Sequence, residues 1–194
     1  SQVLWLKPHL TVILLGSNDS ALNEGQYRTP WEYEHNMMFI LERLLAEKHG
    51  DSAFHSGVCL PVLVTPPPVV DTDFYPFTTT DRIETYGEIV KKLAKGYHCP
   101  VIDVYQAFLD IKEAQGFEAY DALFQFDGVH WSNAGYDVFY ALLEKESLVA
   151  AEIDRVQHVT MGPSAPVLAL LEKYGTAPIK NGARLSDLLK RPQL

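Results

Sequence analysis

The chain has 194 residues, of which 47% are hydrophobic and 21% charged, a balance typical of one globular domain that can bury an apolar core. Its formal net charge of -9 repels phosphate backbones and anionic lipid surfaces, which argues against a nucleic-acid partner or a membrane-surface role. No apolar run approaches the roughly 20 residues that a membrane-spanning helix requires. We therefore expect a cytoplasmic protein.

The charge is unevenly distributed. Residues 155–194 carry six basic and two acidic side chains, a net charge of +4, whereas residues 1–154 carry 10 basic and 23 acidic ones, a net charge of -13. This contrast predicts a domain at 1–154 followed by a basic C-terminal extension at 155–194. The extension can fold back on the acidic body, cover a partner's site in a dimer or stay disordered, and its apolar stretch VLALLEKYG favours docking.

The first half of the chain alternates between strand and helix patterns. Residues 9–16 form a short apolar run closed by a glycine, which is typical of a strand buried on both faces of a parallel sheet. Residues 33–47 place apolar side chains at helical spacing, and a second apolar strand follows at 58–65. The helical spacing recurs at 81–97, where Asp81 with a glutamate three residues later predicts a capping box.

The second half continues the alternation. A third strand is expected at 100–105 and a helix at 106–115. A last amphipathic helix is expected at 132–146, with Ser132 as its N-cap. Strands that alternate with helices predict an α/β fold in which helices cover both faces of a parallel sheet.

Three strands are few for such a sheet, because doubly wound sheets usually have about five or six. The strand at 9–16 would also present an apolar edge with unpaired backbone groups, which proteins normally cover. We therefore expect one or two further strands on the amino-terminal side of Ser1.

Polar residues follow the first predicted strand and precede the last predicted helix. In a parallel sheet, ligands bind at the rim formed by the carboxyl ends of the strands. Asn18 can donate its side-chain amide to an oxyanion at that rim, or can serve only a local turn. Asp127 and His130 are three residues apart, so the carboxylate can orient one ring nitrogen and leave the other as a general base. A solvated turn carboxylate and a surface histidine are the alternative.

The block GSND after a buried strand, together with DGVHWSNAGY before the last amphipathic helix, resembles the SGNH hydrolases, also called the GDSL esterase/lipase family. The stretches GSNDSAL and TPPP are most similar to the isoamyl acetate-hydrolysing esterases of that family. The resemblance covers roughly residues 9–150. It implies a flavodoxin-like three-layer α/β/α sandwich and serine-dependent ester hydrolysis with neither a metal ion nor another cofactor.

Carried over by position, the resemblance assigns Asn18 to the oxyanion hole, His130 to the catalytic base and Asp127 to the carboxylate that orients His130. In that mechanism His130 takes the proton of a serine, the serine attacks the ester carbonyl, and Asn18 donates to the resulting oxyanion. The family's serine precedes the Gly-x-Asn-Asp block, as does a glycine of its oxyanion hole. The residues before Gly16 contain no Gly-Asp-Ser. The nucleophile is therefore expected upstream of this chain.

The triplet of Gly50, Asp51 and Ser52 has the family's letters but follows the asparagine block. It lies after a predicted helix and before a predicted strand, which places Ser52 at the amino-end rim of the sheet. A strand of about six residues separates the two rims by roughly 20 Å. Ser52 is therefore interpreted as a decoy and not as the nucleophile.

Several other residues have two interpretations. The apolar stretch 65–70, with Phe74, Tyr75 and Phe77, is either a stiff wall beside the site or a rigid surface loop. The histidines show no metal-ligand spacing, so no metal site is expected.

Packing is the simpler interpretation for the remaining candidates. Cys59 and Cys99 are interpreted as buried free thiols. Trp131 is expected to pack on the last helix. Ser17 and Ser20 are interpreted as turn hydroxyls.

The leading functional hypothesis is a carboxylic ester hydrolase that acts on small or short-chain acyl esters. Under this hypothesis the partner is a small-molecule ester, and no nucleic acid, membrane span or cofactor is expected. A homodimer is possible. The competing hypothesis is a non-catalytic SGNH-like protein that acts as an interaction or ligand-binding module. In the ligand-binding form, Asn18 and Asp127 would hold a polar ligand.

Overall fold

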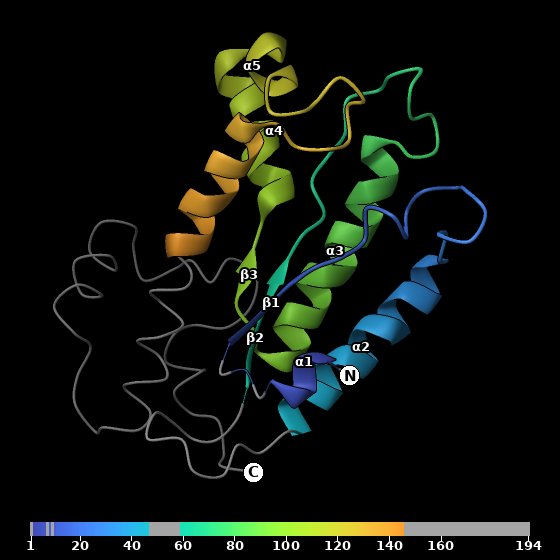
Figure 1. The fold of residues 1–194 in the computed structure, drawn as a ribbon, viewed down its shortest axis with the longest axis vertical. Helices are drawn as coiled ribbons and strands as arrows, with labels where there is room; N and C mark the ends of the chain where they lie inside the picture. Colours follow the sequence, from blue (N-terminus) through green and yellow to red (C-terminus); the bar gives the residue numbers. More distant parts are fainter. Residues whose placement is uncertain (1, 7, 9, 47–58, 146–194) are drawn as a thin grey trace, which may run out of the picture.

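The computed structural model describes residues 2–6, 8, 10–46 and 59–145 (Figure 1). The triplet around Ser52 and the extension at 155–194 lie outside these residues. Predictions about them therefore stay predictions.

A three-stranded parallel sheet forms the centre of the described region (Figure 1). Its strands are β1 (Leu10–Leu14), β2 (Leu60–Val64) and β3 (Val101–Ile102), in the order β1-β2-β3. The central strand β2 has four consecutive buried residues, as expected for a strand covered on both faces. The predicted parallel α/β fold is confirmed.

Two helices cover one face of the sheet. They are α2 (Pro30–Ala46) and α3 (Thr80–Tyr97), and their apolar sides pack with Ile13 and Leu63 of the strands. Met37 and Leu41 of α2 are almost fully buried there, as the helical spacing predicted. These contacts form the first of two cores.

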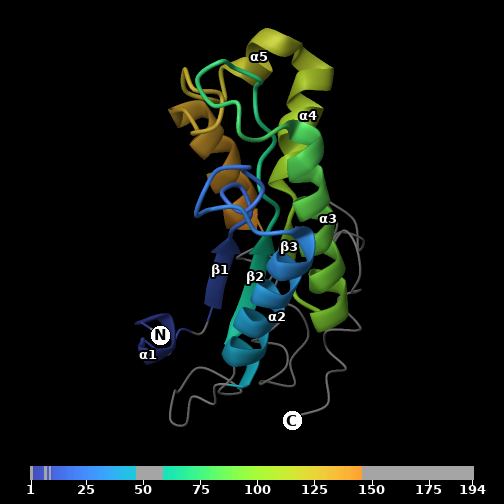
Figure 2. The ribbon, with the colours of Figure 1, turned by 90° about the vertical axis from the view of Figure 1, so that its right-hand side faces the viewer.

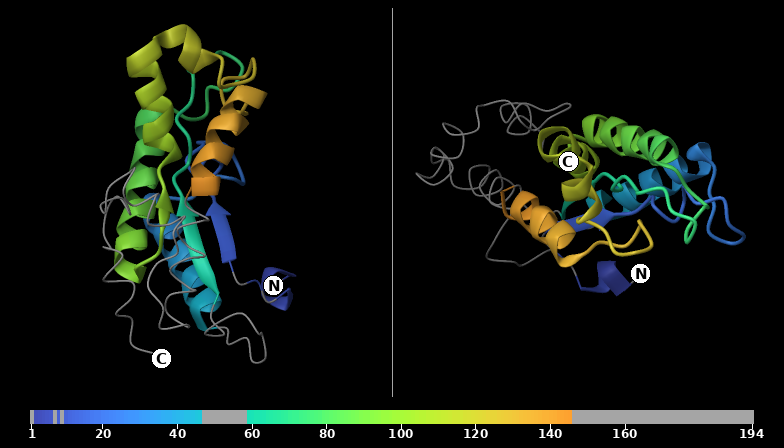
Figure 3. Two further views of the ribbon diagram at one scale, coloured as in Figure 1. Left: turned by 90° about the vertical axis from the view of Figure 1, so that its left-hand side faces the viewer. Right: turned by 90° about the horizontal axis from the view of Figure 1, so that it is seen from above.

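Two helices lie against the opposite face, α4 (Val104–Gln115) and a helix at 133–145, and the short α5 (Phe117–Asp121) follows α4 beyond the ends of the strands (Figure 1). Seen from above, the sheet lies between this group and the pair α2 and α3 (Figure 3). Phe108 of α4 is fully buried between the sheet and residues 123–139. The three layers are those of the predicted α/β/α sandwich.

Side-chain caps set the helix boundaries, and some of these differ from the prediction. The N-cap of α3 is Thr79, which accepts a hydrogen bond from the Arg82 amide at 3.3 Å, so the capping box predicted at Asp81 is wrong by two residues. Asp103 caps α4, which shortens the third strand from the expected 100–105 to two residues. Ser132 does cap the last helix, with its Oγ 3.3 Å from the Gly135 amide.

The helix α2 starts three residues earlier than predicted because a capping box lies upstream of the apolar pattern. The Thr29 amide donates to the Glu32 carboxylate at 2.8 Å, and the Glu32 amide donates back to the Thr29 hydroxyl at 3.2 Å. Pro30 occupies the first helical position, where a missing N–H costs nothing.

The exposed edge of the sheet and the two thiols complete the fold. The strand β1 pairs only with β2 in the described region, and Leu10 and Leu14 are each 37% exposed. Cys59 and Cys99 are buried free thiols, as predicted. Among the helices described, none is both long and apolar enough to cross a membrane.

Candidate active site

A tight turn at residues 124–131, hereafter the His130 turn, carries two of the predicted site residues. Its ends are joined by an antiparallel bridge between Phe124 and Trp131. Further along, the Gln125 amide donates to the His130 carbonyl at 2.7 Å. The Gly128 amide donates to the Gln125 carbonyl at 2.9 Å and closes the turn. The side chains of Asp127 and His130 are therefore held by a small hydrogen-bonded loop.

The structure brings Asp127 and His130 together. The His130 ring nitrogen Nδ1 is 2.5 Å from Asp127 Oδ2. The other carboxylate oxygen, Oδ1, accepts the amides of Val129 and His130, each at 3.0 Å. Both carboxylate oxygens are thus engaged by the turn that carries the histidine, which fixes the ring relative to the carboxylate.

The hydrogen bonds also set the charge state of Asp127. Partial burial on its own would raise the pKa of the Asp127 carboxyl, but the hydrogen bonds from the His130 ring and from the amides of Val129 and His130 outweigh it and lower that pKa. The carboxylate is therefore ionised over the physiological range and can hold a proton on His130 Nδ1. The second ring nitrogen, Nε2, has no hydrogen-bond partner among the described residues, and the ring is 71% exposed.

The His130 turn is fixed to the segment that follows β2, residues 65–79, hereafter the β2 loop. The Val70 amide donates to the Gly128 carbonyl at 2.9 Å, and the Thr72 hydroxyl donates to the Asp127 carbonyl at 2.9 Å. Gly128 has a φ of +72°, and a Cβ atom at this position would lie 2.2 Å from the Val70 carbonyl oxygen. Only glycine allows this close approach.

Aromatic packing supports the His130 turn from below. Trp131 is only 7% exposed, and its ring centroid is 5.6 Å from that of Phe108 and 5.3 Å from that of Phe139. Trp131 therefore packs on the last helix, as predicted. The Tyr120 hydroxyl donates to the Val69 carbonyl at 2.8 Å, which ties this core to the β2 loop.

Asn18 lies in the loop after β1. The turn around it is made by main-chain groups, since the amides of Ser20 and Ala21 donate to the carbonyls of Gly16 and Asn18 at 2.9 and 3.1 Å. The Asn18 side chain is exposed, and no hydrogen bond to it occurs within the described residues. Its amide is thus not used by the local turn, which was the alternative that the sequence left open.

Two close contacts fix the start of this loop. Gly16 has a φ of +123°, and a Cβ atom there would lie 3.0 Å from the Tyr33 hydroxyl and 3.2 Å from Pro66 Cγ. The Tyr33 hydroxyl donates to the Leu15 carbonyl at 3.0 Å. Burial raises the pKa of the Tyr33 phenol, so the hydroxyl keeps its proton and remains a donor.

The Asn18 loop docks on the far end of the β2 loop. The buried Ser20 hydroxyl is 2.9 Å from the Thr78 hydroxyl and donates to the Ser17 carbonyl at 2.8 Å, so the prediction of a turn hydroxyl is confirmed for Ser20. The Leu22 amide donates to the Phe77 carbonyl at 2.8 Å. Both the Asn18 loop and the His130 turn lie beyond the carboxyl ends of the strands (Figure 2).

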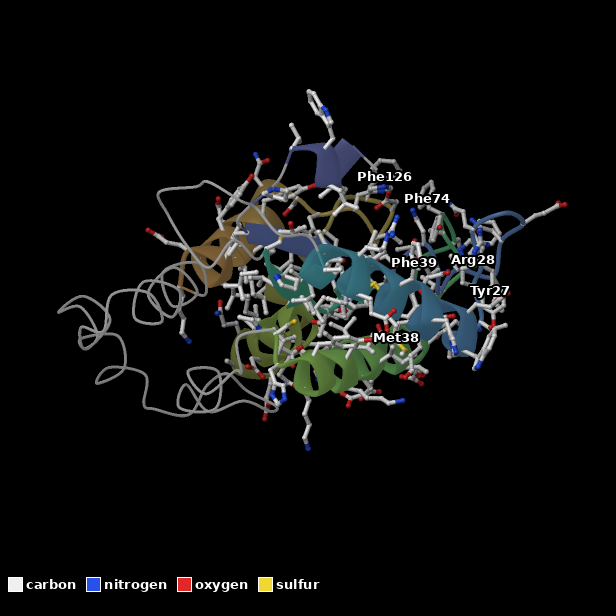
Figure 4. All side chains as sticks on the ribbon, turned by 90° about the horizontal axis from the view of Figure 1, so that it is seen from below. Tyr27, Arg28, Met38, Phe39, Phe74 and Phe126 are labelled. Carbon is white, nitrogen blue, oxygen red and sulfur yellow. The ribbon has the colours of Figure 1, made fainter. Side chains whose placement is uncertain are left out.

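The β2 loop combines a buried stem with an exposed aromatic tip. Residues 65–70 are buried, so this stretch is part of the interior and the interpretation as a surface loop is wrong. Phe74 and Phe126 lie side by side at the rim, with ring centroids 5.4 Å apart in an edge-to-face arrangement (Figure 4). They remain 71% and 77% exposed.

Sequence reasoning missed Thr72, Gly128 and the contact between Phe74 and Phe126. The dipeptide Asp127-Gly128 is a turn signal and could have indicated the left-handed conformation of Gly128. The other contacts join segments about fifty residues apart and have no local signal.

Neither a serine partner of His130 nor a metal site occurs among the described residues. No serine hydroxyl in the described parts of the chain is hydrogen-bonded to His130. Within residues 2–6, 8, 10–46 and 59–145, no three His, Cys, Asp or Glu side chains are grouped so that they could hold a metal ion.

Comparisons with known proteins identify what this chain is similar to. The sequence model of the GDSL-like lipase/acylhydrolase family matches residues 1–138. A lipase/acylhydrolase from Enterococcus faecalis has a similar structure, with a TM-score of 0.60 and 27% identity over 75% of this chain and 64% of that one. A GDSL-like lipase from Bacteroides thetaiotaomicron has a TM-score of 0.59 and 23% identity over 76% of this chain and 66% of that one.

An acetylxylan esterase from Geobacillus stearothermophilus has a TM-score of 0.58 and 21% identity over 74% of this chain and 61% of that one. The chain thus spans less than two thirds of each of these three structures. The two with less than 25% identity show the fold alone.

A shorter similarity is to curated tRNA uridine 5-carboxymethylaminomethyl modification enzymes, MnmG. The protein from Caldicellulosiruptor saccharolyticus is 40% identical over 52 residues, and that from Listeria welshimeri is 36% identical over 63 residues. These stretches are 27% and 32% of this chain but only 8% and 10% of the two enzymes. The chain therefore spans no more than a tenth of the length of these relatives.

Gly128→Ala should lower the free energy of unfolding by about 3 kcal/mol, because strain at positive φ costs roughly 1–2 kcal/mol and the overpacking against Val70 a further 1–3 kcal/mol. Gly25→Ala is the matched control, since Gly25 also has a positive φ, +88°, but nothing lies within 4 Å of its added Cβ. Urea denaturation of both variants measures the difference. Equal losses would show that the His130 turn is not tightly packed on the β2 loop.

The lowered pKa of Asp127 makes stability depend on pH with a defined sign. The ionised carboxylate stabilises the folded chain above the ordinary aspartate value of 3.8, and this contribution is lost as pH falls through the lower folded value. The difference in unfolding free energy between wild type and Asp127→Asn should therefore be constant above about pH 5 and shrink below about pH 4. Urea denaturation across this range tests it, and a difference that grows on acidification would contradict the assignment.

Proposed function

The chain belongs to the GDSL-like lipase/acylhydrolase family, and from this premise we propose that the complete protein is a carboxylic ester hydrolase. The observation that carries the proposal is the pair of Asp127 and His130 at the carboxyl-end rim of the sheet, with Nδ1 bound and Nε2 without a partner among the described residues. A histidine held in this way is prepared to accept a proton from a nucleophile.

In the proposed mechanism, His130 Nε2 removes the proton of a serine hydroxyl as the serine oxygen bonds to the ester carbonyl carbon. Asp127 keeps the other ring proton on Nδ1 and stabilises the imidazolium that forms. The Asn18 amide donates to the oxyanion of the tetrahedral intermediate. His130 then protonates the departing alcohol, and a water molecule activated by the same nitrogen releases the acid and regenerates the serine.

We place the nucleophilic serine in a segment that precedes Ser1. None of the serines described is hydrogen-bonded to His130, and the open side of β1 has half-exposed leucines that a further strand would cover. Ser52 is not a candidate in this proposal. Ser52 lies outside the described residues, and the proposal keeps the prediction that it is a decoy because its sequence position falls between α2 and β2.

The proposed substrates are esters with small or short-chain acyl groups, as in the isoamyl acetate-hydrolysing branch of the family. The stem of the β2 loop supports this choice, because Pro66, Pro67 and Pro68 are buried and their fixed φ angles make the stem stiff, so it cannot easily move aside for a large acyl group. The Geobacillus stearothermophilus protein is an acetylxylan esterase, but at 21% identity it supports the fold only.

The remaining proposals concern organisation. We propose residues 1–154 as the hydrolase domain, residues 155–194 as a basic extension, and a cytoplasmic protein, monomer or homodimer, that works without a cofactor or a nucleic-acid partner.

The absence of a described serine beside His130 favours one other function, a non-catalytic interaction or ligand-binding module. A fluorophosphonate probe discriminates the two, because only a serine hydrolase reacts with it covalently. Labelling of the complete natural protein supports the esterase. Absence of labelling together with absence of ester hydrolysis supports the module.

His130→Ala in the complete protein should lower kcat for p-nitrophenyl acetate by about 10²- to 10⁴-fold, the usual contribution of a general base. His35→Ala is the control, since His35 is an exposed histidine on α2 that stacks on Trp31 with ring centroids 4.1 Å apart. Steady-state hydrolysis measures both variants. Full activity without His130 would refute the assignment of the base.

Asn18→Ala should lower kcat by about 10²- to 10³-fold with little change in KM, because an oxyanion donor acts mainly in the transition state. The control is Asn36→Ala, which removes an exposed asparagine from α2. An equal rise in KM with kcat unchanged would show instead that Asn18 binds the ground state of the substrate.

A further inference from the structure

Two hydrogen bonds hold the peptide groups on either side of Gly128. The Asp127 carbonyl accepts the Thr72 hydroxyl at 2.9 Å, and the Gly128 carbonyl accepts the Val70 amide at 2.9 Å. The two donors come from the β2 loop, and both acceptors come from the His130 turn. The contact therefore joins segments that are 55 residues apart in the sequence.

The His130 turn needs these bonds because its centre is a glycine. Glycine allows the φ of +72° that the turn requires, but it also allows the neighbouring peptide groups to rotate at low steric cost. A rotation of the peptide between Asp127 and Gly128 would move the amides of Val129 and His130 away from Asp127 Oδ1. The carboxylate and the ring would then no longer be held in a fixed relative orientation.

We propose that Thr72 is a positioning residue for His130, whose hydroxyl holds the Asp127 peptide in the orientation in which the Asp127 carboxylate binds the His130 ring. Among the described residues, Thr72 has no hydrogen bond to the ring or to the carboxylate, and its hydroxyl binds the main chain of the turn. The catalytic consequence rests on the proposed function, whereas the effect on the pair of Asp127 and His130 does not depend on it.

The Thr72 side chain contacts the turn with both of its branches. Its hydroxyl binds the Asp127 carbonyl, and its methyl group Cγ2 lies 2.9 Å from the position that a Cβ on Gly128 would take. Thr72→Val keeps the branched shape and removes the hydroxyl, whereas Thr72→Ser keeps the hydroxyl and removes the methyl group. The two variants therefore separate hydrogen bonding from packing.

Thr80 supplies a matched control from the neighbouring part of the same region. The Thr80 hydroxyl also donates to a main-chain carbonyl at 2.9 Å, that of Val69, and it is likewise partly buried. This bond fixes the β2 loop to the start of α3 and does not involve the His130 turn. Thr80→Val therefore removes a donor bond of the same length, together with the longer bond at 3.4 Å that the Thr80 hydroxyl accepts from the Val69 amide, without removing the one that we assign to positioning.

The first experiment uses the chain as it stands, with ¹⁵N-labelled histidine, and observes the proton of the His130 Nδ1 hydrogen bond by NMR. Thr72→Val should weaken this low-field signal, shift it upfield and speed its exchange with water, whereas Thr72→Ser and Thr80→Val should keep it close to wild type. The inference is overturned if Thr72→Val retains the wild-type signal. It is also overturned if Thr80→Val loses the signal to the same extent.

The second experiment measures ester hydrolysis by the complete protein. Thr72→Val should lower kcat by about 2- to 10-fold, the equivalent of one ordinary hydrogen bond, with KM nearly unchanged, and Thr72→Ser should recover most of the loss. A loss confined to KM would overturn the positioning role. Full activity of His130→Ala would refute the proposed function instead, and the NMR result would still decide the role of Thr72.

Discussion

The candidate site depends on the β2 loop being fixed at both of its ends. Near its start, the Val69 carbonyl accepts the Tyr120 hydroxyl at 2.8 Å. Near its end, Thr78 and Phe77 bind the loop that carries Asn18. The Asn18 loop and the His130 turn are more than a hundred residues apart in the chain, but both bind the β2 loop. The β2 loop therefore sets their relative position at the rim.

The first residue of this segment is anchored by a partly buried ionic network. The Thr65 hydroxyl donates to Asp103 Oδ1 at 3.1 Å and accepts the Tyr105 amide at 3.0 Å, while Lys91 Nζ lies 2.9 Å from Asp103 Oδ2. Asp103 also caps α4. A single carboxylate thus joins α3, the start of α4 and the end of β2. The side chains that hold the rim in place therefore start directly at the carboxyl end of β2.

The alternation of strands and helices could be predicted from the sequence because it depends on the local spacing of apolar residues. The helix starts at Pro30 and Val104 were missed because hydrogen bonds to the side chains of Thr29 and Asp103 set them. The prediction used the apolar spacing, which begins a few residues after these caps. The pair of Asp127 and His130 could be expected from its three-residue spacing. The support from Thr72 could not, since it is a contact between two loops that only the folded sheet brings together.

The exposure of His130 determines what the described residues contribute to the chemistry. At 71% exposure, water would solvate an imidazolium well, so the direct Coulombic support from Asp127 is strongly screened. Orientation is not screened in this way: two amides and one ring nitrogen bind the same carboxylate, and the ring can occupy only a narrow range of angles. The described residues therefore supply mainly geometry. In the proposed ester hydrolysis, the electrostatic part of catalysis requires water to be displaced from Nε2, which a bound ester and the nucleophile would do when they occupy the rim.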